Sequence, residues 1–81
     1  MSVPSDLSEL SEEQLAALLR AVITELAGRG TPDSFSALVE ASAQVGTGLG
    51  ESARQVAARS SWTQVGELSG TTKQAAWSRW R

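Results

Sequence analysis

Apolar residues recur with a helical period along most of the chain, and this pattern predicts a protein built of helices. The first run extends from about residue 12 to Ala27 and ends at two glycines, Gly28 and Gly30. Ser11 and Gln14 have the spacing of a capping box at its start. Its apolar residues form a wide stripe that must be covered by the rest of the domain or by a second copy, and we assign them to dimerisation: Leu15, Leu18, Leu19, Val22, Ile23 and Leu26.

A second helical pattern begins with Thr31 as the N-cap and Pro32 in the first helical position. Glycines at positions 46, 48 and 50 then allow two interpretations. Either the helix ends near Val45 and a new one begins at about residue 51, or a single helix continues to about Arg59. Three interior glycines cost roughly 3 kcal/mol in helix propensity, but the apolar period continues across them. We therefore predict one long second helix and leave a kink at the glycines open.

Residues 61–81 read as two short helices joined by a tight turn. Ser61 can cap the first helix, and Thr71 or Thr72 can cap the second. Gly70 stands where the chain must reverse, because glycine adopts a left-handed conformation at little cost. Gly66 lies inside the first helix, where it indicates a close helix crossing. No repeat or strand pattern is present, so we predict an all-α fold with an N-terminal amphipathic helix, a long second helix and a C-terminal helix-turn-helix.

The same patterns divide the chain into three parts. Residues 1–10 are expected to be a flexible N-terminus, since Pro4 and Ser5 interrupt any periodic pattern. Residues 11–60 are expected to form the helical core and dimerisation region. Residues 61–81 are expected to be the helix-turn-helix.

Composition excludes several kinds of chemistry. The 81 residues contain no Cys and no His, so neither thiolate nor imidazole ligands are available for a metal. The acidic residues lie at predicted helix starts and exposed faces without a nucleophile beside them, and we expect no enzyme activity, cofactor or small-molecule ligand. No stretch has the ~20 apolar residues of a membrane span, and no secretory signal is present. We expect a cytoplasmic protein, and the Arg-rich, Ala-rich composition is typical of GC-rich bacteria.

Charge is distributed unevenly along the chain. The net charge is −2, but residues 1–51 sum to −6 and residues 52–81 to +4. Such asymmetry between halves is typical of a segment that faces a polyanion. Five basic residues in thirty are also close to an average content. Charge alone therefore does not decide between a polyanion-binding segment and an ordinary protein surface.

The last quarter of the chain resembles the helix-turn-helix of small actinobacterial regulators. In that pattern a Ser-Trp start and an Ile/Val-Gly pair precede the turn, and a helix of the Ser-Arg-Gln-Ala-Ala-Trp type follows it. The resemblance extends loosely over residues 52–60, and two positions depart from it, Ser69 before the turn glycine and Thr71 after it. The matching residues are Ser61, Trp62, Val65, Gly66, Gly70, Thr72, Lys73, Gln74, Ala75, Ala76 and Trp77. The resemblance implies binding to double-stranded DNA, with the helix that follows Gly70 in the major groove.

Side-chain chemistry suggests a role for each candidate residue. Gln74 can pair with adenine, and Lys73 can reach guanine or a phosphate. Trp77 suits either contact with a thymine methyl group or packing against Val65 in the preceding short helix. Trp62 and Trp80 are expected to pack in the core. The remaining candidates suit phosphate contacts or the outer side of the second helix. The predicted DNA-binding set is Thr72, Lys73, Gln74, Trp77, Ser78, Arg79, Arg81 and Arg59.

Three functional hypotheses follow. The first is a nucleoid-associated transcription regulator that binds DNA as a homodimer, with two reading heads one DNA turn or a multiple apart. The second is a helical adaptor that uses a degenerate helix-turn-helix to bind another regulator or an RNA polymerase subunit, and Ser69 and Thr71 favour it. The third is the dimerisation module of an antitoxin, although the sequence has no disordered toxin-binding tail.

Overall fold

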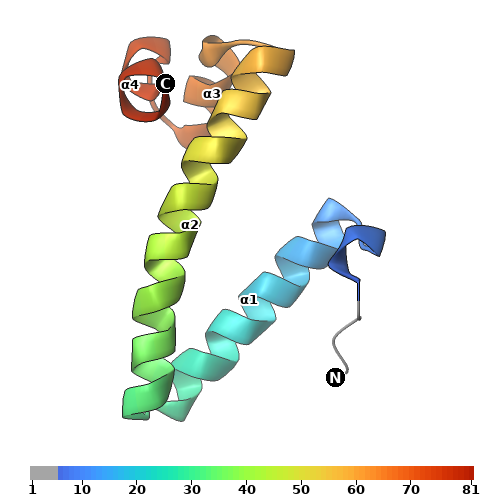
Figure 1. Ribbon diagram of the computed structural model, residues 1–81, viewed down its shortest axis with the longest axis vertical. Helices are drawn as coiled ribbons and strands as arrows, with labels where there is room; N and C mark the ends of the chain where they lie inside the picture. Colours follow the sequence, from blue (N-terminus) through green and yellow to red (C-terminus); the bar gives the residue numbers. More distant parts are fainter. Residues whose placement is uncertain (1–5) are drawn as a thin grey trace. The chain divides into compact units, whose positions relative to one another are not determined.

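A computed structural model describes residues 6–81, and all of the regular secondary structure in this part of the chain is helical. A short 3₁₀ turn, η1 (Leu7–Glu9), precedes four helices in the order α1 (Glu12–Arg29), α2 (Pro32–Arg59), α3 (Trp62–Ser69) and α4 (Lys73–Trp80) (Figure 1). The all-α prediction is therefore confirmed. Over residues 6–81 no helix is both long and apolar enough to span a membrane. The chain divides into two compact units between residues 39 and 40.

The first unit begins with η1, which the sequence pattern did not predict. The Asp6 carboxylate accepts hydrogen bonds from the amide of Ser8 at 3.0 Å and from its hydroxyl at 2.6 Å. The bond from the Ser8 hydroxyl is the larger cause, and the bond from the amide the smaller, of a pKa of Asp6 below its ordinary value of 3.8. Both bonds stabilise the charged form of the carboxylate. The predicted flexible N-terminus thus contains a regular turn at residues 7–9, and residues 1–5 lie outside the described part of the chain.

The capping box at the start of α1 is confirmed. The Ser11 hydroxyl accepts from the Gln14 amide at 3.1 Å, and the Gln14 side chain accepts from the Ser11 amide at 2.9 Å. No side chain of α1 is fully buried. The predicted apolar stripe divides into three half-buried residues, Leu15, Leu18 and Leu26, and three that are 41% to 52% exposed, Leu19, Val22 and Ile23.

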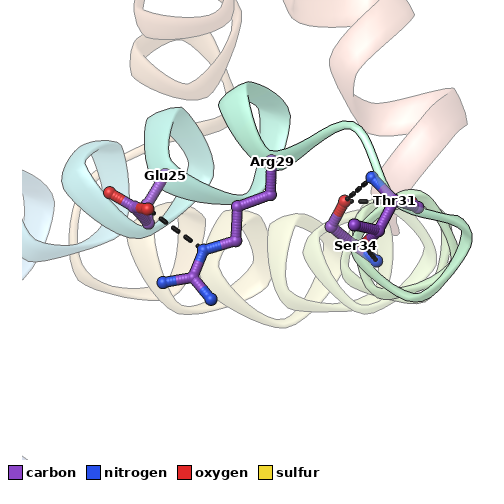
Figure 2. A network of polar contacts seen from close by, with 4 residues as sticks. All are labelled: Glu25, Arg29, Thr31 and Ser34. Atoms are coloured by element: carbon purple, nitrogen blue, oxygen red, sulfur yellow. Dashed lines mark hydrogen bonds and ion pairs between the residues drawn. The ribbon is translucent and has the colours of Figure 1, made fainter.

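The link between α1 and α2 is stabilised by local hydrogen bonds (Figure 2). Gly30 ends α1 in the left-handed conformation, with φ of 60°. Thr31 then caps α2 as predicted, because its hydroxyl accepts from the Ser34 amide at 3.1 Å. The buried Ser34 hydroxyl accepts from the Thr31 amide and donates to the Thr31 carbonyl, both at 3.0 Å. Arg29 forms an exposed ion pair with Glu25 in the last turns of α1.

The prediction of a single long second helix is confirmed, since α2 is assigned without a break through all three glycines. Gly50 is buried in the second unit, whereas a methyl group added at Gly46 or Gly48 would have no neighbouring atom within 4 Å. Neither Gly46 nor Gly48 has a positive φ. Neither steric crowding nor backbone conformation within residues 6–81 therefore requires glycine at these two positions.

The second unit, residues 40–81, has a small core to which α2, α3 and α4 each contribute one residue. These residues are Ala53, Val65 and Ala76, and the half-buried side chains of Val56, Ala57, Trp62 and Trp80 surround them. The packing roles predicted for Trp62 and Trp80 are confirmed. Because two of the three central residues are alanines, little apolar surface is buried.

Substitution of Gly48 by alanine is expected to stabilise the protein. Gly48→Ala should raise the free energy of unfolding by about 0.5–1 kcal/mol, because alanine favours the helix and the added methyl group meets no neighbour. Urea denaturation followed by circular dichroism measures this change. A loss of stability would instead indicate that α2 is interrupted at this position in solution.

Candidate nucleic-acid interface

Both short helices of the second unit begin at a hydroxyl cap. The Ser61 hydroxyl accepts from the Gln64 amide at 3.1 Å at the start of α3, as predicted. Of the two threonines considered for α4, Thr72 is the cap, since its hydroxyl accepts from the Ala75 amide at 3.1 Å. Each cap satisfies a backbone donor that the helix itself leaves unpaired.

The turn between α3 and α4 closes through backbone hydrogen bonds. Gly70 has φ of 75° and ψ of 28°, so the left-handed conformation predicted for it is confirmed. Its amide donates to the Glu67 carbonyl at 3.4 Å, and the Thr71 amide donates to the Gly66 carbonyl at 2.8 Å. This pair of bonds is the Schellman arrangement, which ends a helix and fixes the direction of the chain that follows.

Gly66 allows the start of α4 to lie directly against α3. A methyl group on Gly66 would lie 2.8 Å from the Thr72 carbonyl carbon, 2.9 Å from the Lys73 nitrogen and 2.9 Å from the Thr71 oxygen. All three neighbours are backbone atoms, which cannot rotate away as a side chain can. The close crossing predicted from Gly66 is therefore present, and the fully buried Ala76 continues this contact one turn further along α4.

The two departures from the resemblance pattern have different structural outcomes. Ser69 is accommodated within α3, since its hydroxyl donates to the Val65 carbonyl at 2.7 Å and to the Gly66 carbonyl at 3.3 Å. Thr71 is exposed and takes part in the turn through its amide. Leu68 does not take over the packing of the apolar residue that Ser69 replaces, because its side chain is 72% exposed. Leu68 lies about 60° around α3 from Val65, away from the side that contacts α4.

Leu68 lies instead at an open, mainly apolar groove of about 190 Å³, which the sequence pattern did not predict. Its lining comes from three helices that are separated in the sequence, so no local period could have indicated it. The lining residues are Leu49, Ser52, Ala53, Val56, Val65, Leu68, Ser69 and Trp80.

The predicted contact residues of α4 are all exposed. Lys73, Trp77 and Arg81 are spaced by four residues and so follow one side of the helix. The Arg81 guanidinium lies 4.3 Å from the centre of the Trp77 ring, and Trp77 remains 41% exposed. Arg79 lies on the opposite flank, 4.9 Å over the Trp80 ring. The exposed residues are Thr72, Lys73, Gln74, Trp77, Ser78, Arg79 and Arg81.

The cationic groups of α4 have no carboxylate partners in the described structure. Within residues 6–81 the one ion pair joins Arg29 to Glu25, far from α4 in the sequence. Arg59, the remaining predicted contact, is exposed in the last turn of α2, and no hydrogen bond or ion pair described for this part of the chain links it to α4. No three acidic side chains among residues 6–81 gather as a metal site.

Comparison of the chain with protein-family models, with curated proteins and with solved structures finds no match. The functional interpretation of α4 therefore depends on its own geometry and chemistry.

Substitution of Gly66 by alanine is expected to have the opposite effect to Gly48→Ala. Gly66→Ala should lower the free energy of unfolding by about 1–3 kcal/mol, because the added methyl group overlaps the backbone at the start of α4. Gly48→Ala is the matched control, since both changes add one methyl group to a helix. Equal stability of Gly66→Ala and the wild type would contradict the close contact between α3 and α4.

Proposed function

We propose that the chain is a DNA-binding protein of the helix-turn-helix type that inserts α4 into the major groove, and that it acts as a transcription regulator or nucleoid-type factor. The observation that carries the proposal is the division of α4 into two sides. Ala76 is completely buried against the unit, while Lys73, Gln74 and Arg81 are exposed. A helix that packs against the protein on one side and presents polar and cationic residues on the other suits contact with base edges and phosphates.

The residues of α4 suit distinct contacts with a duplex. Gln74 and Lys73 lie in its first turn, the part of a recognition helix that reads base edges, where Gln pairs with adenine and Lys with guanine. Arg79 and Arg81 lie on opposite flanks, which suits the phosphates of the two strands that border the groove. Trp77 supports the guanidinium of Arg81 and leaves part of its ring available for a thymine methyl group.

Charge supports the same orientation. Residues 40–81 contain five basic and three acidic residues, whereas residues 6–39 contain two basic and six acidic residues. A duplex is attracted to the first set and repelled by the second, so the encounter favours the unit that contains α4. The resemblance of residues 61–81 to actinobacterial regulators supports the same function and a nucleoid-associated, cytoplasmic location.

A homodimer is the second part of the proposal. Few phosphate contacts are available to one α4, so a single copy would bind DNA weakly and with strong salt dependence. The exposed apolar residues of α1 offer a surface for a second copy, since Leu19, Val22 and Ile23 follow one side of that helix. Two copies would then present two α4 helices to half-sites one turn or a multiple apart.

DNA binding is tested by fluorescence anisotropy of a labelled random duplex at several salt concentrations. Lys73→Ala/Arg81→Ala should weaken binding and lower the slope of log K against log salt by about 1 to 2, because Arg81 neutralises a phosphate and Lys73 reaches a guanine or a phosphate. The control Arg20→Ala/Arg29→Ala removes the same charge from α1 and should leave the slope unchanged. Absence of binding near ~50 mM salt would contradict general DNA docking through α4.

The dimer is tested by sedimentation equilibrium. Leu19→Gln/Ile23→Gln should convert a dimer into a monomer, because the exposed apolar surface of α1 becomes polar while glutamine preserves helix propensity. Ala17→Gln/Ala21→Gln places the same residues on the other side of α1 and should remain dimeric. A wild-type chain that sediments as a monomer throughout the micromolar range would contradict this part of the proposal.

A protein–protein adaptor is the second candidate function, and the exposed Leu68 beside the apolar groove favours it. Leu68→Gln separates the two candidates. DNA affinity that survives this substitution supports DNA binding. Binding to a purified regulator or RNA polymerase subunit that Leu68→Gln abolishes, without any DNA affinity, supports the adaptor.

A further inference from the structure

Arg54 connects two helices that are far apart in the sequence. It extends from α2, and its Nη1 donates a hydrogen bond of 3.0 Å to the backbone carbonyl of Trp80, 26 residues away. Trp80 is the last residue of α4, and its carbonyl belongs to the final four of a helix, which have no partner within the helix.

Gly50 provides the space in which this contact forms. It is buried one turn before Arg54, and a methyl group at this position would lie 3.3 Å from Arg54 Nη1 and 3.7 Å from Cδ1 of the Trp80 ring. The bare backbone of Gly50 thus lets the guanidinium and the indole approach α2 together. Unlike Gly48, Gly50 has a packing reason to be glycine.

The other parts of α4 are held by different contacts. The turn packed on Gly66 holds its start, and the buried Ala76 holds its middle. The last turn has the half-buried Trp80 ring and the Arg54 hydrogen bond to α2. An arginine is well suited to this position, because a cation near the carboxyl end of a helix also interacts favourably with the helix dipole.

We propose that Arg54 is a positioning residue that holds the carboxyl end of α4 against α2 and so fixes the direction of the helix. The role of Arg54 in DNA binding rests on the function proposed above. In that role Arg54 orients α4 and makes no phosphate contact of its own. This assignment distinguishes Arg54 from Arg59, a second exposed arginine of α2 that has no described bond to α4.

Amide hydrogen exchange of the full chain, measured by NMR, tests the contact without DNA. Arg54→Ala should speed exchange in the last turn of α4, including the Arg81 amide, roughly two- to tenfold, as expected for the loss of one hydrogen bond. Arg59→Ala is the control and should leave α4 unchanged, and Arg54→Lys should restore part of the protection. Unchanged exchange in Arg54→Ala, with wild-type helicity, would overturn the proposal.

The duplex titration tests the positioning role. Arg54→Ala should weaken DNA binding severalfold and leave the salt slope unchanged. The substitution loosens the orientation of α4 but removes no phosphate contact. A slope that falls by about 1 would overturn the assignment and make Arg54 a direct phosphate contact. If the wild type does not bind DNA, the proposed function fails, while hydrogen exchange still decides whether Arg54 holds α4.

Discussion

The arrangement of the second unit depends on one backbone contact, the approach of the α3–α4 turn to Gly66. The turn atoms lie where any side chain at this position would be, so α4 begins directly on the surface of α3. Gly70 makes the approach possible by reversing the chain in a left-handed conformation. Ala76 can then be fully buried by helices that pass close to it.

This contact explains how so small a unit can present an ordered helix. The core contains two alanines and one valine at its centre, and little hydrophobic free energy is available from residues of that size. Caps, the Schellman bonds and the Arg54 hydrogen bond add local constraints at the helix ends. Because backbone geometry holds α4 from behind, its outer side is free to carry polar and cationic residues, on which the proposed function depends.

The sequence predicted those features that depend on neighbouring residues. Ser11, Ser61 and Gly70 behave as their positions indicate, because caps and turns are determined within a few residues of chain. The exposure of Leu68 and the Arg54–Trp80 bond could not be predicted in this way, since both depend on how α2, α3 and α4 pack. For the candidate site, the period of α4 predicted which residues face outward, but the tertiary structure was needed to show that Arg54, and not Arg59, is bonded to α4 among residues 6–81.

The central claim is that the outer side of α4 is the surface that meets DNA, and the most direct measurement is NMR chemical-shift mapping. A short duplex is titrated at low salt into ¹⁵N-labelled protein, with backbone amides and indole N–H groups observed together. The account predicts that shifts concentrate on residues 72–81 and on the Trp77 indole, with little change in α1. Shifts centred on α1 or on the groove at Leu68, or no shifts at all, would contradict it.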